Sequence, residues 1–273
     1  MGATQEIHAA AVAGLFYPRE AGELRTWIQT MFHDAGDLEV FPPTAKALIV
    51  PHAGYIYSGP VAAMAYAGLS GLKGVIRRVV LLGPTHHVLV SGLALPGVQA
   101  FETPLGRVPL DGAAVRHIQF MPQVSISPAA HAQEHSIEVQ LPFLQQTLGD
   151  FQIVPLAVGD ATPGEVAEVI EALWGGPETL IVVSSDLSHY LPYDLAQKVD
   201  HQTCERILEL HELESHEQAC GATPVNGLLL AAQHHHLTPH LLDLRNSGDT
   251  AGDRRQVVGY AAFVFSQESN HDP

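Results

Sequence analysis

The sequence predicts an α/β fold in which one mostly parallel or mixed β-sheet is covered by helices on both faces, giving a single three-layer domain over residues 1–273. Three observations lead to this prediction. Apolar runs of strand length recur along the chain, and amphipathic segments of helical period lie between them. No low-complexity linker, internal repeat or long charge run divides the sequence. Its length alone would allow one large domain or two small ones.

Six apolar runs, each bounded by Gly, Pro or polar residues, are the expected strands. They are residues 45–50, 79–82, 92–95, 151–158, 179–183 and 257–265. Most are apolar at successive positions, which is typical of strands buried between two helical layers. Residues 101–110, with Pro104, Leu105 and Gly106 near the centre, predict a hairpin, so strands of both directions are expected.

Four segments predict helices between these strands. Residues 136–148 carry one apolar stripe, but Pro142 removes a hydrogen bond there, so this helix should kink or begin near residue 141. Thr162 followed by Pro163 is a favourable helix start, and this helix should run to about residue 174. Two further helices are expected over residues 194–210 and from residue 224 to residue 232.

The composition limits the classes of protein and partner. A hydrophobic fraction of 46% with 15% charged residues indicates a globular chain. The 13 basic and 29 acidic residues give a net charge of −16, which argues against nucleic acid and acidic membranes as partners. Residues 1–8 lack the pattern of a secretion signal, so we expect a cytoplasmic protein whose Cys204 and Cys220 stay reduced.

Histidines follow three of the predicted strands within a few residues. His52 comes after the first strand, His86 and His87 after the second, and Asp186 and His189 after the fifth. Because ligands bind at the carboxyl ends of strands in open α/β sheets, these side chains are expected to meet. A single histidine in a Gly/Pro corner is more often a partner in a turn, but three such corners favour a common site.

Three other motifs carry groups that could contribute to a site. Glu134 and Glu138 flank His135 near the start of a predicted helix. Acidic residues there have a structural alternative, because they interact favourably with the positive end of the helix dipole. Cys220 precedes the predicted helix at residue 224, whose dipole would lower the thiol pKa, although a packed small side chain is the alternative. Residues 247–253 are interpreted as a flexible acidic loop, or only as a turn.

Two patterns favour other interpretations. His234, His235 and His236 follow an apolar run, and consecutive helical residues point in different directions, so this tract is predicted to be a solvated helix end rather than a metal site. The residues between Ser184 and His189 include every type needed for a Ser-His-Asp triad. The Gly-x-Ser-x-Gly elbow is absent from the sequence, as are a Walker loop and a dinucleotide fingerprint in the right context.

Six motifs in order along nearly the whole chain resemble those of the Memo family, whose bacterial and archaeal branch is called AmmeMemoRadiSam system protein B. The motifs begin at Ala13, Pro51, Gly83, Glu134, Ser184 and Val257 and read AGLFYP, PHAGY, GPTHH, EHSIE, SSDLSH and VVGY. The resemblance implies a fold similar to that of class III extradiol dioxygenases, which open catechol rings with a non-haem Fe(II) held by two histidines and a carboxylate.

The resemblance also implies roles for individual residues. His52 and His86 match the two histidine ligands, and Cys220 matches the third ligand of the family in place of the carboxylate. His189 matches the histidine that transfers protons. Asp186 is expected to orient His189 or to contact the metal ligands without binding the metal itself. A thiolate is a softer ligand than a carboxylate and favours Cu(I), Zn²⁺ or a thiolate-ligated iron, and two imidazoles suit all three. Because members of the family bind iron or copper, the resemblance implies one iron(II) or copper ion per chain, with zinc as a third choice.

Three residues are expected around this centre rather than in it. His135 and Tyr55 are predicted to line the pocket, and His87 is predicted to form a hydrogen bond near the site, because adjacent turn residues rarely bind one ion together. Three functions stay open: a metal-dependent redox enzyme with an unknown small-molecule substrate, a metal carrier without turnover, and a peptide-binding or protein-binding module. The branch name also implies a functional link to radical SAM and AMMECR1-like proteins.

Overall fold

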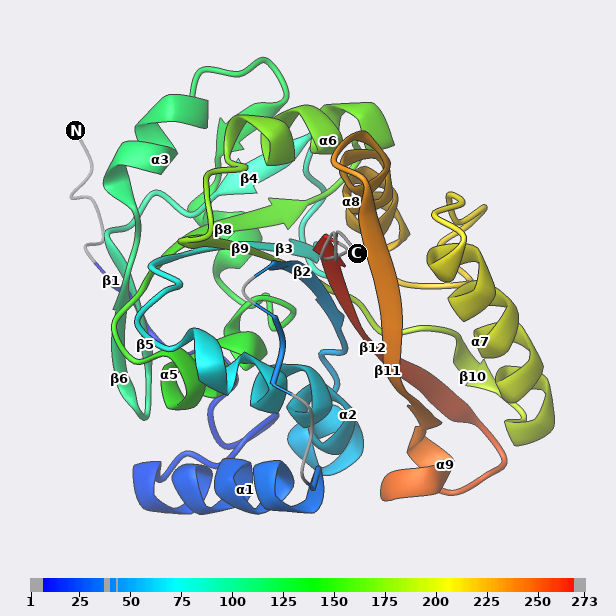
Figure 1. Ribbon diagram of the computed structural model, residues 1–273. Coiled ribbons are helices and arrows are strands. Elements are labelled where there is room, and N and C mark those ends of the chain that lie inside the picture. The colour runs from blue at the N-terminus through cyan, green and yellow to red at the C-terminus, as the bar shows by residue number, and fades with distance from the viewer. Residues whose placement is uncertain (1–6, 37–39, 43, 268–273) are drawn as a thin grey trace, which may run out of the picture.

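The computed structural model describes residues 7–36, 40–42 and 44–267 and builds them around one mixed β-sheet (Figure 1). The strand order is β10-β12-β2-β9-β3-β8-β4-β7, with β11 paired to β12. The four central strands are parallel. They are β2 (Ala45–Val50), β9 (Thr179–Ser184), β3 (Arg78–Pro84) and β8 (Gln152–Val158).

The flanks of the sheet are mixed in direction. On one side, β12 (Val257–Gln267) runs antiparallel to β2 and also pairs with β11 (Leu237–Asn246) and β10 (His189–Leu191). On the other side, β4 (Leu93–Leu95) runs antiparallel to β8, and β7 (Val124–Ile126) runs parallel to β4. The mixed sheet confirms the predicted class of sheet.

Helices cover both faces of the sheet, so the predicted three-layer α/β fold is confirmed (Figure 1). One face packs against α1 (Ala21–Asp34), α2 (Tyr55–Gly68) and α5 (Leu141–Leu148). The other face packs against α3 (Gly112–Ile118), α6 (Pro163–Ala172), α7 (Tyr193–Leu208) and α8 (Ala222–His234). Side chains of β2 alternate between the two cores, with Leu48 on one side and Ile49 on the other.

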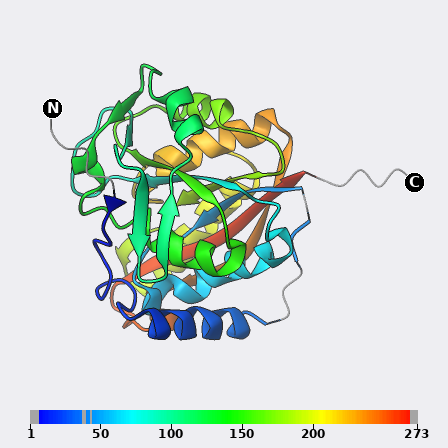
Figure 2. The same ribbon diagram turned by 90° about the vertical axis from the view of Figure 1, so that its left-hand side faces the viewer.

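A second, smaller sheet stands beside the main one (Figure 2). It consists of β1 (Ile7–His8), β5 (Ala100–Thr103) and β6 (Gly106–Pro109). The antiparallel pair β5–β6 is the hairpin that the Pro-Leu-Gly sequence predicts. The remaining short elements are α4 (Pro128–His131), α9 (Ser247–Thr250) and two 3-10 turns at Leu69–Leu72 and Glu138–Gln140.

Local sequence signals explain where several helices begin. Pro142 occupies the first turn of α5, which therefore begins at Leu141 after a 3-10 turn. Thr162 and Glu165 form a reciprocal capping box at the start of α6. The first part of the segment expected to be a flexible acidic loop or a turn forms the single helical turn α9, because Asn246 caps it and the Asp249 carboxylate accepts the Asn246 N–H. Residues 251–253 follow it outside any helix or strand. None of the described helices has the length and apolarity needed to cross a membrane.

Asp200 makes the stability of the fold depend on pH. This buried carboxyl accepts the Ser188 N–H at 3.0 Å, and burial raises its pKa to about 6 despite that hydrogen bond. The folded protein thus binds a proton that the unfolded chain has already released, so stability falls as pH rises from about 4 to about 6.

We expect Asp200→Asn to remove this pH dependence. Because the folded pKa of about 6 exceeds the ordinary aspartate pKa of 3.8 by roughly two, the stability of the variant relative to the parent should rise by about 3 kcal/mol between pH 4 and pH 6. Urea unfolding at pH 4 and pH 7 measures this difference. Exposed Asp194→Asn on the same helix is the control, and equal pH slopes in the parent and Asp200→Asn would contradict the assignment.

Candidate metal centre

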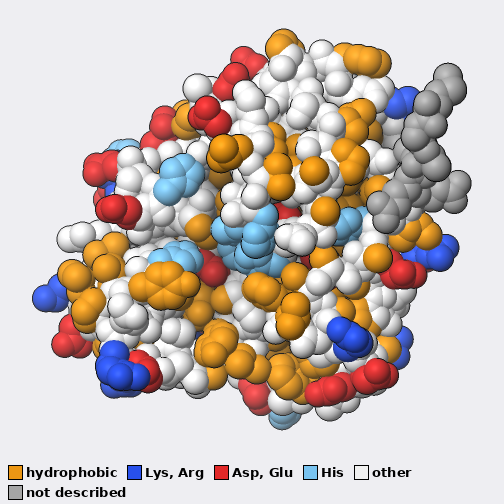
Figure 3. All heavy atoms as spheres, turned by 180° about the vertical axis from the view of Figure 1, so that it is seen from behind, with side chains coloured by type: hydrophobic (Ala, Val, Ile, Leu, Met, Phe, Trp, Pro, Cys, Tyr) orange, Lys and Arg blue, Asp and Glu red, His pale blue; other side chains and the backbone are white. Residues whose placement is uncertain are grey.

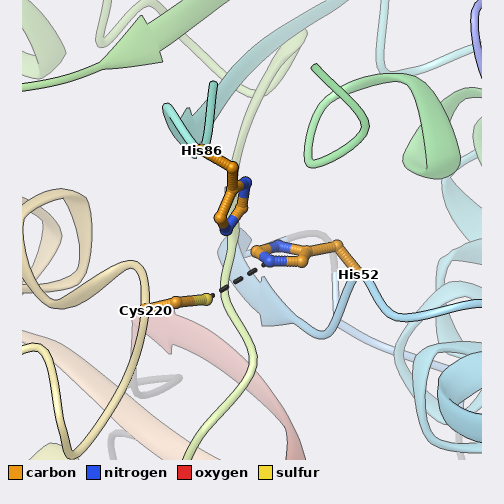
Figure 4. Close-up of side chains that lie close together, drawn as sticks. All are labelled: His52, His86 and Cys220. Atoms are coloured by element: carbon orange, nitrogen blue, oxygen red, sulfur yellow. Dashed lines mark hydrogen bonds between the residues drawn. The ribbon is translucent and has the colours of Figure 1, made fainter. Parts of the chain in front are cut away.

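The carboxyl ends of three neighbouring parallel strands form the floor of the site. His52 follows β2, His86 follows β3, and Asp186 follows β9, which lies between β2 and β3 in the sheet. Cys220 comes from the segment that connects α7 to α8. Figure 4 shows the two imidazole rings and the thiol turned toward one another from these separate elements.

The ligand atoms of His52, His86 and Cys220 lie within 4.8 Å of one another. The Cys220 Sγ is 3.2 Å from the His52 Nε2, and the two histidine rings meet edge to face with centroids 5.2 Å apart. Two imidazoles and one sulfur are ligands that zinc, copper and iron all accept. The residues present therefore fit a transition metal.

Ser184 determines which nitrogen of His52 is free. The Ser184 hydroxyl donates to the Ser136 carbonyl at 2.5 Å and accepts from the Gln140 amide at 2.8 Å, so its remaining lone pair accepts the Nδ1–H of His52 at 2.9 Å. The unprotonated Nε2 therefore faces Cys220. Burial, together with the nearby His86, lowers the pKa of His52 to about 3, so this imidazole is neutral and able to bind a cation.

Glu134 determines which nitrogen of His86 is free. Burial alone would raise the pKa of Glu134, but the hydrogen bond and charge of His86 and the Ser136 N–H bring it down to about 2. The ionised carboxylate accepts the His86 N–H at 2.6 Å and holds the His86 Nδ1 at 2.8 Å. The carboxylate thereby orients the ring with its Nε2 free, as in the carboxylate–histidine–metal arrangement of many metal sites.

Cys220 is held by the turn that precedes α8. Its N–H donates to the Asp186 carbonyl at 3.2 Å, and a Cβ on Gly221 would lie 2.7 Å from the Ser185 Cβ, so only glycine allows this close approach. Burial, with the charge of Asp186, raises the pKa of the thiol to about 12, opposite to the lowering expected from the helix dipole. A bound cation would reverse this balance by favouring the thiolate.

Asp186 and His189 occupy different positions around the ligands. The buried Asp186 carboxylate accepts the backbone N–H of His52 at 2.7 Å, so it supports a ligand-bearing turn. The His189 Nδ1 donates to the Leu187 carbonyl at 2.8 Å, which leaves its Nε2 free. His189 is therefore oriented by a backbone carbonyl and not by Asp186, while both residues line the same pocket.

This pocket has a volume of about 1050 Å³. Figure 3 shows histidine side chains gathered in a hollow at the centre of one face, with hydrophobic side chains around it. His52, His86, His135, Asp186 and His189 supply its polar wall. The aromatic and charged side chains around them are Phe16, Tyr57, Tyr190, Tyr260, Asp253 and Arg255.

Two of the three residues expected around the centre differ from the prediction. Tyr55 is buried in the core, where its hydroxyl donates to the Val139 carbonyl at 2.7 Å, because its position at the start of α2 turns it away from the pocket. His87 lies near the site, with its ring 6.4 Å from that of His135, but it is exposed and its side chain makes no hydrogen bond to a described residue. His135 does line the pocket, and its ring stacks on that of His86 with centroids 4.6 Å apart.

Sequence reasoning missed the supporting groups and the aromatic wall. From the sequence, Ser184 is expected only as a candidate nucleophile and Glu134 as a helix acid or an unspecified site group, whereas both orient ligand rings. Tyr190 has a positive φ of 58°, an unusual conformation for a non-glycine residue, and its backbone strain is not visible in the sequence. The sequence offers one sign of these residues, which is that they lie close to the motifs that follow the predicted strands.

The alternative of a nucleophilic triad is not supported by the hydrogen bonds. The Ser185 hydroxyl donates to the Asp186 carbonyl, the Asp186 carboxylate binds the His52 N–H, and the His189 ring binds the Leu187 carbonyl. Within the described residues these groups do not form a Ser-His-Asp chain. Cys204 and Cys220 are both free thiols.

Comparison with known proteins places the chain in a family. The model of Memo-like proteins matches residues 8–264. A MEMO1 family protein of Methanopyrus kandleri is 40% identical over 93% of this chain and 97% of its own length, and one of Sulfolobus acidocaldarius is 36% identical over 95% and 99%. A crystal structure of an uncharacterized protein from Escherichia coli K12 shares the fold, with a TM-score of 0.51, 15% identity and coverage of 79% of this chain and 99% of that one. The chain belongs to the Memo family.

Proposed function

We propose that this protein is a metal-dependent redox enzyme in which His52, His86 and Cys220 bind one iron(II) or copper ion, with zinc as a third choice. The observation that carries the proposal is the convergence of these three ligand atoms, from three separate elements, beside a pocket of about 1050 Å³. Three protein ligands are typical of catalytic metal sites, whereas structural zinc sites use four. When bound, the ion would supply Lewis acidity and electron transfer to a small-molecule substrate.

The chain itself would contribute the movement of protons. His189 lines the pocket, and its Nδ1–H is engaged with the Leu187 carbonyl, so its Nε2 is the atom that accepts or returns a substrate proton. Asp186, whose carboxylate holds the His52 turn, would keep that ligand in place during turnover. His135 and Phe16, whose rings pack with centroids 4.4 Å apart, would limit the access of water from the side of Leu15.

His189→Gln should separate proton transfer from metal binding. We expect metal content equal to that of the parent and turnover lower by roughly 10²- to 10⁴-fold, because a positioned acid or base contributes about that much. Oxygen consumption with a reductant and a panel of catechols measures turnover, and elemental analysis measures metal. His201→Gln on α7 is the control. Turnover equal to that of the parent would show that His189 does not transfer the proton.

Elemental analysis of protein purified without oxygen tests the proposal as a whole. A value near one iron or copper per chain supports it. If the metal content is near zero and anaerobic addition of Fe²⁺ or Cu⁺ gives no binding, the enzyme and the carrier functions both fail. Metal binding without oxygen use would favour a carrier.

A peptide-binding or protein-binding function is the second candidate. The observation that favours it is the rim of the pocket, where Leu15 is 79% exposed and Tyr190 is 67% exposed. Exposed apolar side chains beside a large pocket are typical of recognition surfaces. The link to radical SAM and AMMECR1-like proteins that the family branch suggests would then be a link to such a partner.

A further inference from the structure

A second cluster of ligand-type side chains lies where α6 and α8 end. Glu171, in the last turn of α6, meets His234 and His235 at the C-terminal end of α8. The Glu171 Oε1 is 2.9 Å from the His234 Nδ1, and its Oε2 is 2.8 Å from the His235 Nε2. The ligand atoms of all three residues lie within 4.8 Å of one another.

The two histidines converge because the helix ends between them. His234 is the last residue of α8, and His235 is its C-cap with φ −94° and ψ 8°. His236 then adopts a positive φ of 53°. The expectation that consecutive histidines diverge therefore fails at this point, since it assumes a continuous helix.

Aromatic packing holds one ligand in place before any ion binds. The His235 ring stacks on the Trp174 ring with centroids 3.7 Å apart and an interplanar angle of 7°. The Lys46 ammonium also lies over this indole, 5.1 Å from its centroid, and donates to the carbonyls of Gly176 and Thr179 at 2.9 Å. A ring fixed in this way loses little freedom when its nitrogen binds a metal.

The electrostatics of the cluster favour a cation. The C-terminal ends of two helices meet there, and each contributes negative partial charge from its last carbonyls. Burial would raise the pKa of Glu171, but the hydrogen bonds from His234 and His235 lower it, so the carboxylate is ionised at neutral pH. The net charge of −16 adds a general attraction for cations.

We propose that Glu171, His234 and His235 form a second metal site, separate from the His52–His86–Cys220 group, that binds a first-row divalent cation such as Zn²⁺ and links α6 to α8. Two imidazoles and a carboxylate are a common ligand set for Zn²⁺. Metal–ligand distances of about 2.0–2.1 Å in a tetrahedral site require ligand separations of about 3.3 Å. The two N···O contacts of 2.9 and 2.8 Å would open slightly, and any separation near the 4.8 Å limit of the cluster would close. The His234 side chain is 73% exposed, which lets water complete the coordination.

Tryptophan fluorescence tests this site without depending on turnover. The chain has two tryptophans, so a Trp27→Phe protein reports on Trp174 alone. We expect Ni²⁺ to quench the Trp174 emission in a saturable manner and Zn²⁺ to compete with it. His234→Gln keeps a donor for Glu171 but removes the nitrogen ligand, so the apparent affinity should fall at least tenfold.

Two controls decide how the result is interpreted. His236→Gln alters the neighbouring histidine, which is outside the cluster, and should leave quenching unchanged. Cys220→Ala should also leave it unchanged, which separates this site from the proposed catalytic centre. If quenching is the same in His234→Gln and in Glu171→Gln as in the Trp27→Phe parent, Glu171 and the histidines form only an ion pair between helices, and the proposal is wrong.

Discussion

Cys220→Ala is expected to bind iron or copper at the proposed centre with an affinity lower by more than about 100-fold. Even residues that only support a metal ligand cost about 10- to 100-fold when mutated, and Cys220 supplies one of three converging ligand atoms. Its removal leaves two neutral imidazoles and no anionic ligand in the group. Anaerobic titration with Fe²⁺ or Cu⁺, followed by elemental analysis after gel filtration, measures the loss.

Cys204→Ala is the matched control for this experiment. Cys204 is buried, whereas Cys220 is half-buried, and Cys204 lies in the core between α7 and the sheet. Its removal takes away a thiol and a similar volume without touching the candidate ligands. Equal metal affinity in Cys220→Ala and Cys204→Ala would show that the thiol at position 220 is not a ligand.

Glu134→Gln is expected to weaken both the fold and the metal centre. The carboxylate accepts the N–H groups of His86, His135 and Ser136 as well as the His86 Nδ1–H. A glutamine turns one acceptor oxygen into a donor, which leaves at least one buried N–H without a partner and costs about 1–3 kcal/mol. The His86 ring also loses its orienting charge, so metal affinity should fall by about 10- to 100-fold.

Glu138→Gln separates these two effects. Glu138 is equally buried and accepts the N–H groups of Ala11 and Val12 and the Tyr17 hydroxyl, but it binds neither His52 nor His86. We expect it to lower the stability toward urea while leaving the metal affinity per folded chain unchanged. A similar loss of affinity in both variants would mean that Glu134 acts through general stability and does not orient His86.

The strands that build the centre could be predicted from the sequence, whereas an edge strand and a helix could not. The predicted run 45–50 coincides with β2 because every residue of that strand is buried, which gives a continuous apolar signal. Among the described residues, β11 pairs with β12 alone, and it contains Pro239 and His240, so it lacks that signal. α2 is buried around most of its circumference and contains Pro60, which hides the helical period.

The candidate ligands could be predicted from the sequence, but the side chains that orient them could not. His52 and His86 follow strands, and strand ends have a known place in an α/β sheet, whereas Cys220 was chosen through the resemblance to the Memo family. The groups that free their Nε2 atoms could not be predicted, since Ser184 reaches His52 across 132 residues and Glu134 reaches His86 across 48. Such pairs depend on the order of strands in the sheet, and local patterns do not contain that order.

The position of β9 between β2 and β3 also determines when the chain can acquire an ion. The turns that carry His52 and His86 are brought together only after β9 has inserted between their strands, and the thiol joins them from 168 residues beyond His52. Zinc fingers use metal capture to drive the folding of a short peptide. Here the three candidate ligands are spread over 168 residues, so a nascent chain has no complete ligand set until residue 220 has been synthesised. Metal loading would therefore mark the completion of folding rather than initiate it.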